Sequence, residues 1–157
     1  MEIADKGGTD SNSYATTIEA DDFFDTQYGS EEWATLDDDT KARLLITATG
    51  MIDEIPLRYG KLDSGQALNF PVANTSSVSD DGFNEAKKAC LAQAMYLFEN
   101  QDAIKEAMQG SIQGIRSEML SRTKKVVAGF NPLKKWSPNT LKLLSRYSQF
   151  DVFARRG

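Results

Sequence analysis

The amino-acid sequence predicts a mainly α-helical fold: a helical bundle with an extended arm or small β-hairpin and a C-terminal helix. Two observations carry this fold class. Apolar residues recur at intervals of three and four over 37–55 and again over 82–100, which is the period of one helix face. Helix-capping signatures also precede two of the expected helices, and Pro56 ends the first of these two apolar runs.

The first helix is expected over 17–28. Thr16 and Glu19 have the spacing of a capping box, in which each side chain caps the backbone amide of the other residue. Residues 1–12 lack periodicity and are expected to form a flexible lead-in. The apolar side chains that this helix should bury are Ile18, Phe23 and Phe24.

A central helix is expected next, because the aspartates at 37–39 stand where the positive end of a helix dipole favours anions. Gly50 within it costs about 1 kcal/mol relative to alanine and indicates a close neighbour or a bend. A third helix is expected over 82–100. The predicted core comprises Phe23, Phe24, Leu45, Ile46, Ile52, Leu91, Leu97 and Phe98.

A long connection, 57–82, separates the second and third helices. Loops of that length are usually functional or mobile, so we expect this one to contact a neighbouring copy or a downstream partner rather than to form core. The candidate contact residues are Arg58, Tyr59, Lys61, Phe70, Asn74 and Val78.

The last part of the chain changes pattern. Residues 111–136 fit neither period and are interpreted as the extended arm or hairpin, whereas Ser137 and Pro138 form an N-cap and N1 pair that predicts a helix start. The predicted organisation is therefore a flexible N-terminus over 1–12, a helical bundle over 13–110, the arm over 111–136, and a C-terminal helix with a docking tail over 137–157.

The residue types restrict the possible chemistry. The chain has no histidine and one cysteine, Cys90, which excludes histidine-dependent triads, an internal disulfide and a cysteine-based zinc site. No glycine-rich nucleotide-binding motif is present, and the aspartate clusters at 21–25, 37–39 and 80–81 lack the spacing of a calcium loop. We predict a protein that is not an enzyme, with no cofactor, no metal site and no membrane span.

The net charge of −5 conceals a division along the chain. Residues 1–100 carry 19 acidic and 7 basic side chains, whereas 101–157 carry 4 acidic and 11 basic ones. Such polarity suits head-to-tail stacking of copies, or docking of the basic end on an acidic partner; an unevenly charged, solvated surface is the simpler alternative. Cations mixed with aromatic residues between 124 and 147 also suit a single-strand binder, although the acidic part would repel phosphate.

Several short motifs occur in a recognisable order. Ser13-Tyr14-Ala15-Thr16 is followed by Glu19-Ala20-Asp21-Asp22-Phe23-Phe24, then by Leu68-Asn69-Phe70-Pro71, and finally by Leu143-Leu144-Ser145-Arg146-Tyr147. This ordered set resembles small phage-encoded proteins that are often labelled DnaT-like single-strand-binding proteins and that behave as head–tail connector adaptors. The resemblance covers about 13–98 and the C-terminal helix, and 111–135 cannot be aligned.

The resemblance implies a virion protein made in the cytoplasm of a host bacterium. It would form a ring, typically of twelve copies, below the portal of a tailed phage, where it would extend the DNA channel and offer a platform to a downstream neck or tail-completion protein. DNA would pass through without sequence-specific binding. The alternative, suggested by the label, is a single-stranded DNA-binding or replication accessory protein.

Within this interpretation, 134–157 is the candidate portal-docking arm, since apolar anchors flanked by cations are typical of an interface. The alternative is that its helix packs back on its own bundle. The predicted docking residues are Lys134, Lys135, Trp136, Leu141, Leu144, Arg146, Tyr147, Phe150, Phe153, Arg155 and Arg156.

Overall fold

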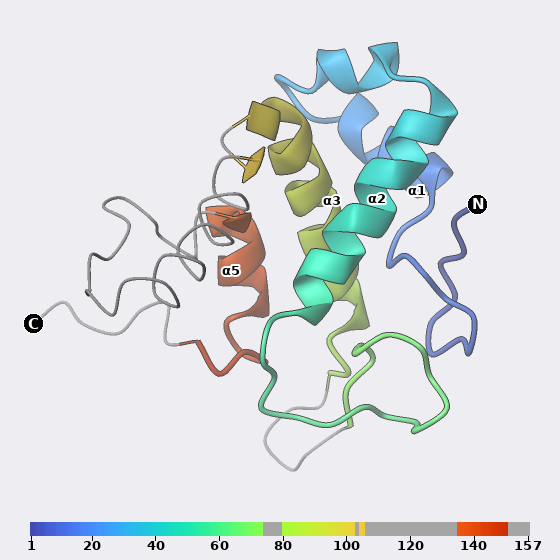
Figure 1. Ribbon diagram of the computed structural model, residues 1–157, viewed down its shortest axis with the longest axis vertical. Helices are drawn as coiled ribbons and strands as arrows, with labels where there is room; N and C mark the ends of the chain where they lie inside the picture. The colour runs from blue at the N-terminus through green and yellow to red at the C-terminus, as the bar shows by residue number, and fades with distance from the viewer. Residues whose placement is uncertain (74–79, 103, 106–134, 151–157) are drawn as a thin grey trace, which may run out of the picture.

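The computed structural model describes residues 1–73, 80–102, 104–105 and 135–150 (Figure 1). The predicted mainly α fold is confirmed: these residues form helices and two isolated β-bridges, with no strand among them. The expected arm or hairpin over 111–136 lies outside the described residues except for its last two. The elements, in order, are α1 (Thr17–Asp25), the 3₁₀ helix η1 (Glu31–Thr35), α2 (Asp38–Asp53), α3 (Phe83–Glu99) and α5 (Pro138–Leu144).

Helix α3 lies at the centre of the bundle, with α2 on one side and α5 on the other (Figure 1). Helix α1 and η1 pack on each other, and α1 also contacts α2. The buried face of α3 is rich in small side chains, among them Ala86, Ala89 and Ala94, which are fully buried. Larger fully buried side chains fill the space around it: Trp33, Tyr14, Tyr147, Phe70, Leu45, Ile52, Ile55 and Leu144.

Most residues of the predicted core are buried, but those at the edges of the helix faces are more exposed than expected. Phe23, Ile46 and Phe98 are only half-buried, and Ile18 is 72% exposed. Helix α1 ends at Asp25 and therefore presents a single narrow face to the bundle. At 3.6 residues per turn, Ile18 stands about 120° around the helix from the buried Phe24, so it faces away from the core.

The first twelve residues are folded against the rest of the molecule, in contrast to the flexible lead-in expected from their composition. Asn12 closes this segment on itself, because its Oδ1 accepts a hydrogen bond from the Ile3 amide at 2.7 Å. The Gly8 carbonyl accepts a hydrogen bond from the Ala67 amide at 3.1 Å, and Lys6 pairs with Asp81 at 2.5 Å. Polar residues thus supply the contacts that hydrophobic periodicity does not reveal.

One stretch of the long connection, 70–72, belongs to the core, which corrects the expectation that the connection would not form core. Phe70 and Val72 are each 1% exposed, and Val72 bridges back to Lys61. The Phe70–Pro71 peptide bond is cis. Gly50, by contrast, has nothing within 4 Å of the position of a Cβ atom, so the close neighbour predicted for it is absent from the described residues.

Candidate functional site

The first of the ordered sequence motifs, around Tyr14, forms a buried hydrogen-bond network. The Tyr14 hydroxyl donates to the Asp53 carboxylate at the end of α2 and accepts a hydrogen bond from the Phe70 amide at 3.1 Å. Asn69 completes the network, since its amide donates to Asp53 Oδ2 at 3.2 Å and its side chain donates to the Asp53 carbonyl at 2.9 Å. The network joins three segments that are far apart in the sequence.

Burial controls the acid–base properties of this network. It raises the pKa of the Asp53 carboxyl, although the hydrogen bonds from Tyr14 and Asn69 act in the opposite direction. Burial also raises the pKa of the Tyr14 hydroxyl, and the neighbouring negative charge of Asp53 raises it further. Burial raises the pKa of the nearby Cys90 thiol to about 11, so this cysteine is neutral at physiological pH and packs as a small apolar residue.

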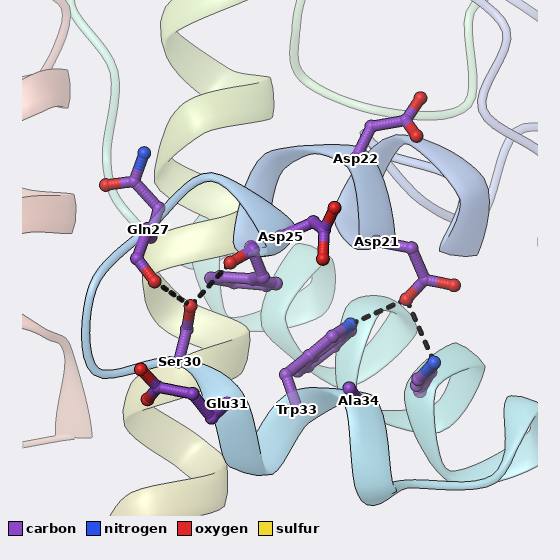
Figure 2. Close-up of a pocket in the computed structure, with 10 residues that line it drawn as sticks. Asp21, Asp22, Asp25, Gln27, Ser30, Glu31, Trp33 and Ala34 are labelled. Carbon is purple, nitrogen blue, oxygen red and sulfur yellow. Dashed lines mark hydrogen bonds and ion pairs between the residues drawn. The ribbon is translucent and has the colours of Figure 1, made fainter.

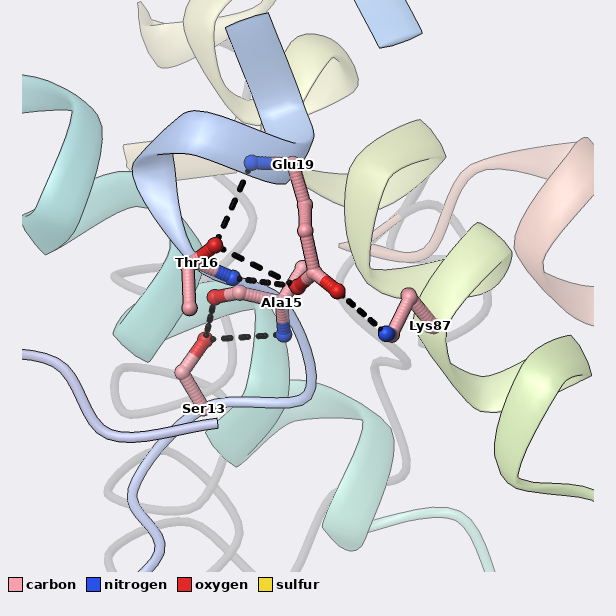
Figure 3. Close-up of polar contacts among 5 residues, drawn as sticks. All are labelled: Ser13, Ala15, Thr16, Glu19 and Lys87. Atoms are coloured by element: carbon pink, nitrogen blue, oxygen red, sulfur yellow. Dashed lines mark hydrogen bonds and ion pairs between the residues drawn. The ribbon is translucent and has the colours of Figure 1, made fainter. Parts of the chain in front are cut away.

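The predicted capping box is confirmed and is linked to α3 (Figure 3). Thr16 Oγ1 accepts a hydrogen bond from the Glu19 amide at 3.2 Å, and Glu19 Oε2 accepts one from the Thr16 amide at 3.0 Å. The other Glu19 oxygen lies 2.5 Å from Lys87 Nζ. Partial burial works against ionisation of Glu19, but the hydrogen bonds from Lys87 and Thr16 outweigh it and lower the pKa of this carboxyl.

The remaining motif residues form an aromatic cluster that continues from Tyr14 through Phe70. The rings of Phe70 and Tyr147 meet edge to face, with centroids 5.5 Å apart, and Tyr59 meets Tyr147 at 6.4 Å. Gly82 packs directly against this cluster, because a Cβ atom there would lie 2.9 Å from both Phe70 and Tyr147. The motifs shared with the resembled family therefore stabilise the subunit itself.

An acidic pocket of about 380 Å³ lies between α1, η1 and the start of α2 (Figure 2). Trp33 Nε1 donates to Asp21 Oδ1 at 2.8 Å, and the buried Lys41 ammonium pairs with the same oxygen at 2.9 Å. Asp25 and Glu31 are exposed and also line the pocket. The one cation in the lining is already neutralised by its own chain, so the pocket disfavours anions such as phosphate.

A second concavity, which we call the α1–α3 groove, adjoins the acidic pocket through Phe24, Gln27 and Ser30. It has a volume of about 380 Å³, near the lower limit of about 300 Å³ for small-molecule pockets, and its lining mixes apolar and polar side chains. Its floor is the outer face of α3. Residues that line it include Phe23, Tyr28, Ala92, Met95, Glu99 and Pro138.

The basic side chains of the described residues are largely engaged internally. These residues carry 20 acidic and 11 basic side chains. Four of the cations pair with carboxylates of the same chain: Lys6 with Asp81, Lys41 with Asp21, Lys87 with Glu19, and Lys135 with Glu54. Two more donate to backbone carbonyl groups, namely Arg58 to Ser148 and Lys61 to Gln66 and Ala67. The described surface is therefore acidic, with few free cations.

The predicted docking arm is mostly part of the subunit core, which is a correction. Trp136, Leu141, Leu144 and Tyr147 are buried within their own subunit, between 0% and 7% exposed, so the alternative that the helix packs back on its own bundle is the correct one for these four. Phe150 is half-buried, and its ring centre lies 5.7 Å from that of Trp136.

Polar contacts explain why the C-terminal helix packs back on the bundle. Gln93 on α3 accepts from the Ser137 amide and donates to the Lys135 carbonyl, both at 2.8 Å. Trp136 Nε1 donates to the Met51 carbonyl on α2 at 2.8 Å. Lys135 also lies over the Trp136 ring. Of the other predicted docking residues, Arg146 is exposed near the Tyr147 ring, and Lys134, Phe153, Arg155 and Arg156 lie outside the described residues.

Of the loop residues predicted to contact a partner, Arg58 and Tyr59 instead hold the loop to the C-terminal segment, and Lys61 binds carbonyl groups within the loop. The Arg58 amide donates to the Tyr147 carbonyl at 2.7 Å, while its side chain donates to Ser148. Phe70 is wrong as a contact residue because it is buried in the core. Asn74 and Val78 lie outside the described residues. Sequence reasoning missed the pairing of Tyr14 with Asp53, and no local signal could have revealed it, since the two residues are 39 positions apart.

Fold and site together define a small, acidic helical-bundle protein. Among the described residues, no group of histidine, cysteine or carboxylate side chains is arranged to hold a metal ion, and no helix is long and apolar enough to span a membrane. The family model described as "Putative DnaT-like ssDNA binding protein" matches residues 1–126, and the chain belongs to that family. No curated protein and no solved structure matches the chain.

Proposed function

We propose that the protein is a structural adaptor of the head–tail junction of a tailed bacteriophage. Copies of the chain assemble into a ring below the portal, extend the DNA channel and provide the platform for the next neck or tail protein. The head–tail role comes from the ordered motifs that resemble connector adaptors. The family match supports the relationship to the DnaT-like proteins and does not extend to this role.

The observation that carries the proposal is the charge of the described bundle. Its 20 acidic side chains outnumber its 11 basic ones, and six of those basic ones are engaged by the chain's own carboxylates and carbonyls. An acidic surface suits a channel through which DNA slides without binding. It also suits contact with the basic end of a neighbouring copy, since a ring is built from heterologous contacts between two different faces.

The second candidate function, binding of single-stranded DNA, is favoured by the description of the family. Such binding requires a cationic groove with aromatic residues on which bases stack. The described bundle offers an acidic surface instead. The cations available for phosphate contacts are concentrated in 101–157, so this function would act through that part of the chain: its cations outside the described residues are Arg116, Arg122, Lys124, Lys125, Lys134, Arg155 and Arg156.

Fluorescence anisotropy with a labelled single-stranded oligonucleotide separates the two functions. Binding to phosphates releases counterions, so a true single-strand binder loses affinity steeply as salt rises. We expect no saturable binding near physiological salt, together with a concentration-dependent oligomer in native mass spectrometry. Saturable, salt-sensitive binding that is abolished by the triple variant R122A/K124A/K125A, in a chain that stays monomeric, would favour the second function.

A further inference from the structure

One side of the bundle carries opposite charges at its two ends. At one end lies the acidic pocket, where the exposed carboxylates of Asp22, Asp25 and Glu31 form no ion pair with the described residues. The α1–α3 groove adjoins this pocket and shares three lining residues with it. Beyond the groove, exposed cations continue the same side along α3 and α5.

These cations, which we call the cationic stripe, are Lys88, Lys142 and Arg146, and all three are exposed. On α3, Lys88 stands about 40° around the helix from the groove-lining Ala92. On α5, Lys142 stands about 60° from Asn139, which also lines the groove, and Arg146 follows one turn later. The stripe therefore lies on the side of the two helices that carries the groove.

The antiparallel packing of α3 and α5 places the stripe away from the acidic pocket. The Thr140 hydroxyl donates to the Ala89 carbonyl at 3.2 Å, and the Tyr147 ring packs against Gly82, so the end of α5 lies beside the beginning of α3. The acidic pocket, by contrast, is built by α1 and η1. In Figure 1, α1 and η1 lie at one end of the long axis and the beginning of α3 lies toward the other.

The chain itself does not supply the anions that the cationic stripe needs. None of the three cations has an ion pair among the described residues, and Glu85, one turn before Lys88, is half-buried. The residues outside the described ranges carry three carboxylates, Glu106, Glu118 and Asp151, against seven cations. Such an excess of cations could neutralise the acidic pocket but not the stripe. A second copy offers charges of the correct sign to both.

We propose that two copies associate through this side about a two-fold axis, with the cationic stripe of each copy at the acidic pocket of the other. A two-fold rotation exchanges the two ends of the side, so opposite charges meet at both ends of the contact. The grooves, with the half-buried Phe23 and Met95 and the fully exposed Tyr28, then face each other at the centre.

The physical roles of these parts differ. The charges fix the orientation and speed the encounter, whereas aromatic and apolar side chains at the centre of a contact supply most of its affinity. The contact is isologous, and it is therefore distinct from the heterologous contacts of the proposed ring. Either contact can exist without the other, so this inference does not depend on the adaptor role.

Charge reversal tests the pairing, and the two-fold axis makes each substitution act twice. Lys142→Glu and Asp25→Lys each bring like charges together at both ends, so each should weaken the dimer at least tenfold in sedimentation equilibrium. An equimolar mixture of the two variants should form a heterodimer with a Kd within threefold of the wild-type value, because opposite charges then meet at both ends.

Matched controls are Arg43→Glu and Asp39→Lys, which make the same changes in net charge at exposed positions. Both stand about 160° around α2 from the pocket residue Lys41. Each control should change the dimer Kd less than twofold, and circular dichroism melting verifies that every variant is folded. A wild-type chain that remains monomeric, or a dimer that both test reversals leave unchanged, would overturn the inference.

Cross-linking distinguishes a two-fold contact from a head-to-tail one. The chain's own Cys90 is buried and its pKa is raised, so introduced thiols are the reactive ones. With a short bismaleimide, the double variant Asp25→Cys/Lys142→Cys should give a two-chain product and no longer species, whereas Asp25→Cys/Arg43→Cys should give no product of two chains. A ladder of longer products would show a heterologous contact, and a single-chain product alone would show an internal one; either would overturn the two-fold assignment.

A labelled single-stranded oligonucleotide tests the competing occupant of the cationic stripe. We expect Lys142→Glu to leave its fluorescence anisotropy titration unchanged, while raising sodium chloride weakens the wild-type dimer by screening the charge pairs. If Lys142→Glu abolishes saturable oligonucleotide binding and leaves the dimer intact, the stripe is a nucleic-acid surface and the inference is wrong.

Discussion

Replacing Tyr14 by phenylalanine tests whether the buried network at Asp53 stabilises the fold. The substitution keeps the ring, which packs edge to face on Phe70 and Phe83, and removes only the hydroxyl. The Phe70 amide then loses its acceptor, at a cost of about 1–3 kcal/mol for an unsatisfied buried group, and Asp53 loses a charge-assisted hydrogen bond worth about 1.5–3 kcal/mol. Because the two contributions overlap, we expect a loss of about 3 kcal/mol of unfolding free energy.

Urea denaturation followed by circular dichroism measures this loss. In a protein whose total stability is about 5–15 kcal/mol, 3 kcal/mol is a large fraction, and it corresponds to a fall in Tm of about 6–12 °C. Tyr28→Phe is the control, because it removes the hydroxyl of a fully exposed tyrosine and should change the free energy by less than about 0.5 kcal/mol. A loss below about 0.5 kcal/mol for Tyr14→Phe would refute the reasoning.

The pH dependence of the same variant identifies the partner of the hydroxyl. The pKa of Asp53 is raised in the folded protein, so its favourable contribution is full below the unfolded pKa near 4 and is lost as pH rises through the folded pKa. The Tyr14 hydroxyl bonds the ionised carboxylate and opposes that rise. The destabilisation by Tyr14→Phe should therefore be larger at pH 7 than at pH 4, and a difference that does not change with pH would exclude Asp53 as the partner.

Three further predictions concern the helices. Gly50→Ala should stabilise the protein by about 0.5–1 kcal/mol, because the position is inside α2 and open to solvent; a loss of stability in chemical denaturation would contradict this. Lys87→Ala should cost about 0.5 kcal/mol more than Lys88→Ala at pH 7, and the difference should shrink as pH falls below about 4.5 and through the lowered pKa of Glu19. Leu144→Ala should lower the free energy of unfolding by about 2–5 kcal/mol in a thermal or urea melt. An unchanged melt would indicate that α5 belongs to a docking arm and not to the core of its own subunit.

Local signals in the sequence predict the helical fold well. The capping box at Thr16 and Glu19 and the Ser137–Pro138 helix start are both present as predicted. The sequence predicts the end of α1 three residues too late, because no residue before Gly29 resembles a stop signal, whereas the helix ends at Asp25. Burial at the edges of a helix face, as for Ile46, depends on tertiary neighbours that a period alone does not reveal.

The candidate site was harder to predict than the fold, because the charge and apolar content of a segment do not determine whether it packs on its own chain or on a partner. The C-terminal helix has the composition of an interface, yet its apolar residues are covered by α3 of the same chain. The signal that decides this is polar and distant: Gln93 binds the backbone on both sides of Trp136. In the same way, Phe70 stands in a polar loop but is buried in the core.

Electron microscopy of the purified chain, alone and mixed with its cognate portal, tests the adaptor role most directly. The account predicts annular particles with an open central channel that dock coaxially on the portal ring. A monodisperse monomer that leaves the portal bare and coats single-stranded DNA instead would contradict the adaptor role.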